Sequence, residues 1–401
     1  MFGGWFRPSA PAEAAPAPAP QNDEPLDRLV LEAAPVPILL AASPGGDPQA
    51  ARVVIANRAA REFFRIAETG GPLSAAVRQP AALEAIETAL CGAPAEAPFP
   101  LPGPQERLWR VIATPLRLER QKLDHALVVL RDETDVRRAE RMRVDFLANA
   151  SHELRTPLAS LAGFIETLRG PAREDEAARD RFLGIMSAQA GRMGRLINDL
   201  LSLSRIELNE HIAPEGTADL ALVVRDVLDA MSPTPDGALP RLEPELPPPG
   251  VAAVRGDRDQ LIQVAQNLID NGVKYAGPIG RVRIVVRRVE AGGGVPGLLG
   301  SAARMPLLEP PRGASGDYAL LSVADDGPGI EREHLPRLSE RFYRVEGQKS
   351  GERLGTGLGL AIVKHILNRH RGGLIVESAP GEGTAFHALV PRAPPEGSGP
   401  S

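Results

Sequence analysis

The chain has 401 residues and a formal net charge of −5 at pH 7. This length suits two or three domains, and the charge gives no electrostatic basis for binding nucleic acid. The single cysteine, Cys91, excludes an internal disulfide and a zinc cluster built from cysteines. No window approaches the ~18–20 apolar residues of a membrane span, and the first 20 residues lack the apolar core of a signal peptide. We therefore expect a cytoplasmic protein without an integral membrane segment.

The N-terminal third divides into a tail and a small domain. Residues 1–24 are rich in alanine and proline and are expected to be disordered, although Phe2, Trp5 and Phe6 are available to touch a membrane or a partner. Residues 25–134 predict an α/β unit. Its expected elements are a helix over 25–34, strands over 37–41 and 51–57, a helix through Phe63 and Phe64, and late strands over 108–113 and 125–130.

Residues 135–212 predict a helical hairpin. Apolar residues recur at spacings of four and three on each arm, and Arg169, Gly170 and Pro171 break the pattern between the arms. The seam positions are Leu147, Ser151, Leu154, Leu158, Leu161, Ile165 and Leu168, then Phe182, Met186, Gln189, Met193, Leu196, Leu200 and Leu203. His152 follows a seam position and should face solvent. Because a hairpin cannot bury two such seams alone, we expect a dimer that forms a four-helix bundle.

Residues 213–392 carry polar and glycine-rich motifs on expected helices and strands. A helix over 218–231 precedes a proline-rich stretch that ends at 249. In a second helix, over 258–275, Asn267, Asn271 and Lys274 share one face at i, i+4 and i+7. The glycine-rich residues 291–316 are expected to be a mobile surface loop, and residues 393–401 a disordered tail.

These motifs suit a bound nucleotide. An amide oxygen is a hard ligand that suits Mg²⁺, and a lysine one turn later can neutralise phosphate. The strand over 320–325 ends in an acid and a glycine-rich turn, where a carboxylate can accept a hydrogen bond from an adenine amino group. The glycines from Gly355 to Gly359 open a helix, where backbone N–H groups favour phosphate. No P-loop pattern is present.

The segment from Ser151 to Leu158 resembles the phosphoacceptor box of sensor histidine kinases, and residues 164–171 and 199–207 resemble the phosphate-regulon branch of that family. Several motifs match in order between about 135 and 392. The resemblance implies a multidomain α+β chain with a dimeric four-helix bundle and a C-terminal α/β sandwich of the gyrase, Hsp90 and histidine kinase (Bergerat) type. Residues 57–60 and 130–134 resemble a PAS sensor domain, whose role as a ligand site or a dimer contact stays open.

The resemblance also assigns roles in binding ATP, with Asn267 as the Mg²⁺ ligand and Asp325 as the residue that reads adenine. Residues 345–353 would form a mobile lid in which Lys349 and Arg353 are available to phosphate. The full set of expected ATP-binding residues is Asn267, Asn271, Lys274, Tyr275, Asp325, Gly327, Gly329, Phe342, Arg344, Gly355, Thr356, Gly357, Leu358, Gly359 and Thr384. Gly272 stands where alanine is more usual and is expected to loosen its helix slightly.

The expected reaction is attack of the His152 imidazole on the γ-phosphate, with Glu153 as general base or as the group that orients the ring. The phosphoryl group would pass to an aspartate of a separate response regulator that docks around Ala159, Gly163 and Phe164. Thr156, one turn after His152, would position a water that dephosphorylates the regulator. We expect a bifunctional kinase and phosphatase, active in phosphate-starvation signalling.

Two other functions stay open. One is a pseudokinase that only binds its regulator, and the other is an ATPase of the gyrase and Hsp90 type. Cys91 and His125 are predicted to be structural rather than ligands of a sensor cofactor. The remaining histidines stand in no metal-binding spacing and are expected at the surface or in packing: His211, His334, His365, His370 and His387.

Overall fold

The computed structural model describes residues 26–66, 70–101, 107–116, 124–231, 240–290, 294–300, 302–310, 317–345 and 355–393. The chain divides into a first unit, Met1–Val144, and a second unit, Asp145–Ser401. Within the described ranges, none of the helices combines the length and the apolar character needed to cross a membrane. The predicted N-terminal tail, residues 394–401 of the predicted C-terminal tail, and most of the predicted lid, including Lys349 and Arg353, lie outside the described residues.

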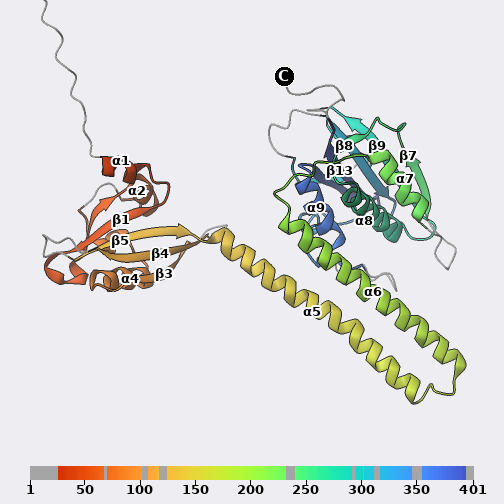
Figure 1. Ribbon diagram of the computed structural model, residues 1–401, viewed down its shortest axis with the longest axis horizontal. Helices are drawn as coiled ribbons and strands as arrows, with labels where there is room; N and C mark the ends of the chain where they lie inside the picture. The colour runs from red at the N-terminus through yellow and green to blue at the C-terminus, as the bar shows by residue number, and fades with distance from the viewer. Residues whose placement is uncertain are drawn as a thin grey trace, which may run out of the picture. The chain divides into compact units, whose positions relative to one another are not determined.

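The first unit is built on a five-stranded antiparallel sheet in the order β2-β1-β5-β4-β3 (Figure 1). Its elements are α1 (Leu26–Ala33), β1 (Ile38–Ser43), η1 (Pro44–Gly46), η2 (Pro48–Ala50), β2 (Arg52–Ala56), α2 (Arg58–Phe64), α3 (Leu73–Ala76), α4 (Pro80–Leu90), β3 (Ala95–Leu101), β4 (Arg107–Leu116) and β5 (Asp124–Asp132). The sequence predicted α1, α2 and four of these strands, but it missed α3, α4 and β3. Strand β3 contains Pro98 and Pro100, which suit it to the edge of the sheet and obscured its strand pattern.

Asn57 organises the start of this unit. Its side chain is fully buried, accepts hydrogen bonds from Ala60 N at 2.9 Å and from Ile38 N at 3.0 Å, and donates to Val36 O at 2.9 Å. It therefore caps α2 and ties that helix to β1. Below it, the core combines small alanines with an aromatic cluster in which Phe63 lies 4.9 Å from Trp109 and 5.0 Å from Phe64, ring centroid to centroid.

The predicted hairpin is present as α5 (Thr134–Arg169) and α6 (Glu176–Leu208). Asp175 caps α6 by accepting a hydrogen bond from Ala178 N at 3.0 Å. Two seam residues, Leu147 and Leu158, are 58% and 57% exposed. In contrast, Leu196 and Leu203 of the predicted α6 seam are buried in the core of the second unit. The predicted seam therefore divides into an open part and a part that packs within its own chain.

The rest of the second unit is a two-layer sandwich of helices on a sheet. Six strands run in the order β10-β12-β13-β11-β9-β7, antiparallel except for the parallel pair of β7 and β9. The elements are β6 (Thr217–Asp219), α7 (Leu220–Ala230), β7 (Arg241–Glu245), β8 (Ala253–Arg255), α8 (Arg258–Ala276), β9 (Arg281–Val289), β10 (Ala303–Leu308), β11 (Tyr318–Asp325), η3 (Leu335–Arg337), α9 (Gly359–Arg369), β12 (Gly373–Ala379) and β13 (Gly383–Pro391). Helices α7, α8 and α9 cover one face of the sheet, and their apolar residues share one core with alternate strand residues (Figure 1).

Gly272 has a packing role rather than a loosening one. A Cβ atom at this position would lie 3.0 Å from Val282 Cγ1 and 3.3 Å from Val323 Cγ1. The absence of a side chain therefore lets α8 lie close to β9 and β11.

The prediction of a mobile loop over 291–316 was wrong for its described residues. Strand β10 lies inside this range and pairs with β12 along the edge of the sheet. The segment before it is held as well, because Leu298 N donates to Glu377 Oε2 at 3.0 Å and Arg304 donates to Val295 O at 2.6 Å. Strand β7 was also missed, and it lies in the stretch that the sequence analysis described only as proline-rich.

Candidate nucleotide and phosphoacceptor site

A cleft of about 480 Å³ opens in the second unit, at the ends of β11 and β13 and the start of α9. It is lined by Arg192, Arg195, Asn198, Asp199, Gln263, Gln266, Asn267, Asp270, Asn271, Lys274, Tyr275, Asp325, Pro328, Gly329, Ile330, Leu338, Tyr343, Arg344, Val345, Gly355, Thr356, Gly357, Gly359, Leu360, Thr384 and Phe386. The cleft thus gathers most of the predicted ATP-binding residues. Gly327, Phe342 and Leu358 lie outside its lining.

Helix α8 presents Asn267, Asn271 and Lys274 to the cleft, as their spacing predicted. The helix begins at a clear cap, because Asp257 accepts from Asp259 N at 3.1 Å and from Gln260 N at 3.3 Å. The opposite side of α8 is buried in the core. This amphipathic arrangement fixes the polar face toward the cleft.

The amide of Asn267 is oriented by its own helix. Its Nδ2 donates to Gln263 O at 2.9 Å, and this leaves Oδ1 free to face the start of α9. A Cβ atom on Gly359 would lie only 2.8 Å from that oxygen. The glycine therefore admits the amide oxygen to the start of α9, and such an oxygen fits a hard divalent cation.

Lys274 reaches the other end of the glycine loop. Its Nζ lies 3.1 Å from Tyr275 Oη, 4.6 Å from the centre of the Tyr275 ring, and 3.2 Å from the position of a Cβ on Gly355. The ammonium group and the glycine loop therefore face the same part of the cleft. A cation beside backbone N–H groups suits a chain of phosphates.

Asp325 ends β11 and is 6% exposed. Burial raises the pKa of its carboxyl to about 7, and the hydrogen bond from Gly327 N at 3.0 Å opposes that rise. Among the residues that the structure describes, no lysine or arginine pairs with this carboxylate. A Cβ on Gly327 would lie 2.6 Å from both Asp325 Oδ1 and Tyr275 O, so the turn after β11 requires glycine there.

Thr384 lies opposite Asp325 in the register of β11 and β13, and it shares a 2.9 Å hydrogen bond with Ser378 through their hydroxyl groups. Thr384 lines the end of the cleft that holds Asp325, and Ser378 supports Thr384 through this hydrogen bond. A buried acid without a cation, beside a hydroxyl, is suited to receive the N–H groups of a ligand.

Phe342 supports the glycine loop from outside the cleft. Its φ of 63° is unusual for a bulky residue, and its N–H donates to Gly357 O at 2.9 Å. A Cβ on Gly357 would lie 2.9 Å from Phe342 Cα. We conclude that Phe342 shapes the loop, while the next two residues, Tyr343 and Arg344, reach the cleft.

Helix α6 supplies a wall of the cleft that the sequence did not predict. Arg192, Arg195, Asn198 and Asp199 all line it. Thr356 of the glycine loop donates to Asp199 Oδ2 at 2.7 Å, and burial raises the pKa of Asp199. Their spacing of i, i+3, i+6 and i+7 places these four polar residues on one face of the helix, and this spacing is the sequence signal for the wall.

The three predicted catalytic residues lie on α5. His152 is exposed, as predicted, and lies outside the lining of the cleft. Glu153 Oε2 pairs with Arg344 at 3.1 Å and with Arg192 at 3.3 Å, and both arginines line the cleft. Thr156 is exposed and donates to His152 O at 3.4 Å. Glu153, the acid beside His152, therefore contacts the cleft through the guanidinium groups of these two arginines.

Residues 142–209 match the family model of the His Kinase A (phospho-acceptor) domain, HisKA. Residues 256–394 match the model of the histidine kinase-, DNA gyrase B- and HSP90-like ATPase, HATPase_c. The chain belongs to the sensor histidine kinases. Its exposed histidine lies in the HisKA part, and the motifs of α8, β11 and the glycine loop lie in the HATPase_c part.

Three curated sensor kinases illustrate the likeness. The phosphate regulon sensor protein PhoR of Pseudomonas aeruginosa is 36% identical over 79% of this chain and 64% of its own length. WalK of Bacillus subtilis is 29% identical over 70% of this chain and 42% of its own. SenX3 of Mycobacterium tuberculosis is 32% identical over 66% and 58%. The chain thus spans less than two thirds of the length of each of these relatives.

Among solved structures, the histidine kinase AdeS of Acinetobacter baumannii is 25% identical and covers 61% of this chain and 98% of its own. The TM-score of this match is 0.41.

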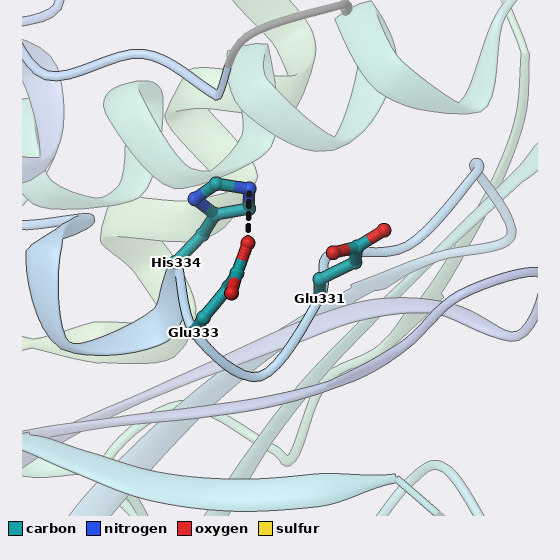
Figure 2. A group of neighbouring side chains, drawn as sticks. All are labelled: Glu331, Glu333 and His334. Atoms are coloured by element: carbon teal, nitrogen blue, oxygen red, sulfur yellow. Dashed lines mark ion pairs between the residues drawn. The ribbon is translucent and has the colours of Figure 1, made fainter.

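The HATPase_c part also contains a cluster that the sequence did not reveal. Figure 2 shows Glu333 against His334, with 3.8 Å between Oε1 and Nε2, and Glu331 beside them. Both glutamates are exposed, and exposed acids often gather without a metal, so we assign no ion here. The Nδ1 atom of His334 lies 2.8 Å from Tyr343 Oη, which places this histidine behind a residue of the cleft.

The other described histidines agree with the prediction of surface or packing roles. His211 is exposed, and His365 is half-buried against Glu210. His370 and His387 are buried, and burial lowers the pKa of both. In the first unit, Cys91 is free and exposed, whereas His125 is buried.

Proposed function

We propose that this chain is a dimeric, ATP-dependent protein-histidine kinase that phosphorylates His152 and passes the phosphoryl group to an aspartate of a separate response regulator. The observation that carries the proposal is the pairing of Glu153 with Arg192 and Arg344, because it connects the exposed histidine box with a cleft that suits a nucleotide. The HisKA and HATPase_c matches support this proposal, because the pairing joins a residue of the phospho-acceptor part, Glu153, to a residue of the ATPase part, Arg344.

In this proposal the cleft binds ATP by its two ends. Asp325 accepts the adenine amino group, since no lysine or arginine of the described part of the chain pairs with its buried carboxylate. Lys274 and the N–H groups of the loop from Gly355 to Gly359 hold the triphosphate. Asn267 presents an amide oxygen that fits Mg²⁺, and a bound Mg²⁺ would offset the charge of the phosphates. Asn271 lies one turn further on the same face.

Phosphoryl transfer to His152 is a direct displacement. The imidazole nitrogen forms a bond to the γ-phosphorus, the bond from that phosphorus to the bridging oxygen breaks, and its electron pair leaves with ADP. The proton on the second ring nitrogen passes to Glu153, which acts as the general base. Glu153 must therefore leave its two arginines before it faces the ring.

The response regulator is proposed to dock on α5 below His152, around Ala159, Gly163 and Phe164. Thr156 lies one turn from His152 and is exposed, so its hydroxyl is available to orient a water toward a phosphorylated regulator. Phosphatase activity is part of the proposal for this reason. The exposed seam residues Leu147 and Leu158 are the surface on which we place the second copy of the chain.

We further propose that residues 25–134 form a PAS-like sensor domain, that residues 135–212 form the phosphotransfer domain, and that residues 213–392 form the ATP-binding domain. The sheet order β2-β1-β5-β4-β3 and the position of this unit directly before α5 support the sensor assignment. The likeness to PhoR supports a role in phosphate-starvation signalling. Deletion of the gene should then misregulate phosphate-starvation genes.

Incubation of the full chain with Mg²⁺ and γ-labelled ATP tests the kinase activity. We expect an acid-labile, alkali-stable label on the wild type and none on His152→Ala. His211→Ala removes another exposed histidine and should keep the label. If the wild type binds ATP but gains no label, a binding-only scaffold replaces the proposal, and steady release of phosphate without a labelled chain indicates a gyrase-type ATPase.

A further inference from the structure

His334 lies behind the cleft, on a stretch of backbone that hydrogen bonds hold in place. Its N–H donates to Glu331 O at 3.0 Å, and its own carbonyl oxygen accepts from Arg337 N at 3.1 Å. The next residue, Leu335, is fully buried in the core of the second unit. These contacts fix the position of His334 on the ATP-binding part, so its imidazole can serve as a firm anchor for another side chain.

The imidazole is bonded to Tyr343, a residue that lines the cleft. The Nδ1 atom of His334 lies 2.8 Å from Tyr343 Oη. The guanidinium carbon of Arg337 lies 4.2 Å from the centroid of the Tyr343 ring, and this arginine also pairs with Glu340 at 3.2 Å. Tyr343 is therefore held both by its hydroxyl group and by its ring.

The surroundings of the other ring nitrogen decide which partner donates in this hydrogen bond. The Nε2 atom of His334 lies 3.8 Å from Glu333 Oε1, and Glu331 lies beside the pair (Figure 2). Negative charge next to Nε2 favours a proton on that nitrogen. In the neutral imidazole, Nδ1 is then the acceptor, and the hydroxyl group of Tyr343 is the donor.

Tyr343 lies between two residues that shape the cleft. Phe342, at a φ of 63°, donates from its N–H to Gly357 O at 2.9 Å and so supports the glycine loop. A bulky residue at this φ is strained and needs surrounding contacts to hold it. Arg344 lines the cleft and pairs with Glu153 of α5 at 3.1 Å. Because the backbone of both neighbours continues through Tyr343, an anchor on Tyr343 sets the position of both.

We propose that His334 is a positioning residue for phosphoryl transfer, an inference that rests on the proposed function. Through Nδ1 it holds the hydroxyl group of Tyr343, and through Tyr343 it keeps the guanidinium group of Arg344 in the wall of the cleft, where it is available to a phosphate. A displaced guanidinium group costs transition-state stabilisation even when the nucleotide still binds. Loss of the Nδ1 contact should therefore slow the transfer step more than it weakens ATP binding.

Labelling of the full chain with Mg²⁺ and γ-labelled ATP tests the proposal in His334→Ala and Tyr343→Phe, which each remove one partner of the hydrogen bond. We expect each variant to lower the rate constant of labelling at saturating ATP by about 10-fold and to leave the ATP dissociation constant nearly unchanged. The double variant should be no slower than either single variant, because both remove the same contact. Additive losses, or weaker ATP binding with an unchanged rate constant, overturn the proposal.

Two amide variants separate the position of the nitrogen from the size of the side chain. His334→Asn places an amide oxygen near the position of Nδ1 and should restore most of the labelling rate. His334→Gln places its amide one bond further from the backbone, near the position of Nε2, and should be as slow as His334→Ala. Equal rates for these two amide variants overturn the role of Nδ1.

Glu331→Ala is the matched control. It removes an exposed acid beside the same histidine and keeps both partners of the hydrogen bond. It should be labelled at the wild-type rate. A loss equal to that of His334→Ala overturns the proposal, because the acidic group and not the contact with Tyr343 would then carry the effect.

A second measurement needs no ATP. The sequence has three tyrosines, Tyr275, Tyr318 and Tyr343, so NMR of the chain labelled with ¹³C at tyrosine Cζ resolves them, and Tyr343→Phe identifies the signal of Tyr343. His334→Ala should shift this signal alone, and His334→Asn should return it toward the wild-type position. A Tyr343 signal that does not move overturns the hydrogen bond.

Failure of the inference and failure of the proposed function give different results. A wild type that binds ATP but gains no label refutes the proposed function. A wild type that is labelled, beside a His334→Ala variant that is labelled equally fast, refutes only the positioning role of His334.

Discussion

Two carboxylates in this chain, Glu133 and Asp325, have opposite surroundings. Glu133 lies where the sheet of the first unit passes into α5, and its side chain is 13% exposed. Hydrogen bonds from Arg131 and Arg110 lower its pKa to about 2. Asp325 lies at the end of β11, where burial raises its pKa to about 7. The same functional group therefore has a pKa far below its ordinary value at one site and a pKa near neutral pH at the other.

The difference follows from the partners of each group. Glu133 lies 2.7 Å from Arg131, 3.0 Å from Arg110 and 3.5 Å from Arg137, measured from oxygen to nitrogen. These pairs join β4, β5 and the first turns of α5. Asp325 accepts hydrogen bonds from backbone N–H groups but has no cation among the described residues. A carboxylate that is paired with several arginines holds secondary-structure elements together, whereas a buried carboxylate without a cationic partner is available to accept hydrogen bonds from a ligand.

The largest expected effect is on stability at Asp325. Because its folded pKa of about 7 lies above the ordinary 3.8, the folded state binds more protons and loses stability as pH rises between these values. Asp325→Asn should therefore be more stable than the wild type at pH 8, by ~4 kcal/mol at most. Urea unfolding at pH 4 and pH 8 measures this, and a gap that does not grow with pH contradicts it. Asp326→Asn, a change in the exposed neighbour, is the control.

The same substitution should weaken nucleotide binding. Removal of the charge from a hydrogen bond to adenine is expected to reduce ATP affinity by about 10- to 100-fold. Displacement of a fluorescent nucleotide measures the dissociation constants of Asp325→Asn and of Asp326→Asn, and only the first should change. Equal losses of ATP affinity in both variants would contradict a hydrogen bond between Asp325 and adenine.

Asp199 provides an intermediate case, since it is half-buried with one hydroxyl donor and a pKa that burial raises. It lies in the cleft where the triphosphate is proposed, so its charge should repel the nucleotide. We expect Asp199→Asn to bind ATP about 3- to 10-fold more tightly. Titration with Mg²⁺ and ATP measures this, and weaker binding would instead make Asp199 a partner of the metal. Asn198→Ala changes the neighbouring cleft residue without changing the charge.

The smallest expected effect belongs to Glu133. Loss of its ion pairs in Glu133→Gln should destabilise the first unit by about 1 kcal/mol at pH 7. The pKa of Glu133 is depressed, so this contribution is present above the ordinary 4.5 and is lost as pH falls toward 2. Fluorescence of Trp109 during urea unfolding of the full chain reports the change. Glu96→Gln removes a single, more exposed partner of Arg110, and it should have less effect.

Motifs held by local spacing were predictable from the sequence. The face of Asn267, Asn271 and Lys274, the exposed position of His152, and the break between the two arms of the hairpin depend on residues within a few turns of one another. Helical periodicity fixes such relations without knowledge of the rest of the chain. The glycine loop and the acid at the end of β11 were readable for the same reason.

Features that depend on distant pairing were missed. Strands β3 and β10 are held by register with strands elsewhere in their sheets, and their own sequences contain prolines or follow a glycine-rich run. The wall that α6 gives to the cleft depends on contacts such as Asp199 with Thr356, which are 157 residues apart. No local pattern encodes that contact.

The sequence by itself determined the chemical parts of this sensor histidine kinase, because histidine, amide, carboxylate and glycine occur at spacings that a single helix or turn imposes. The tertiary structure alone decided which of these parts meet. It buried Asp325 where no lysine or arginine among the described residues pairs with it, placed Glu153 between two arginines of the cleft, and packed α6 on the ATP-binding part of its own chain. Burial sets the charge state of each group, and long-range contacts decide which other groups it can touch. Burial and long-range contacts arise only once the chain has folded.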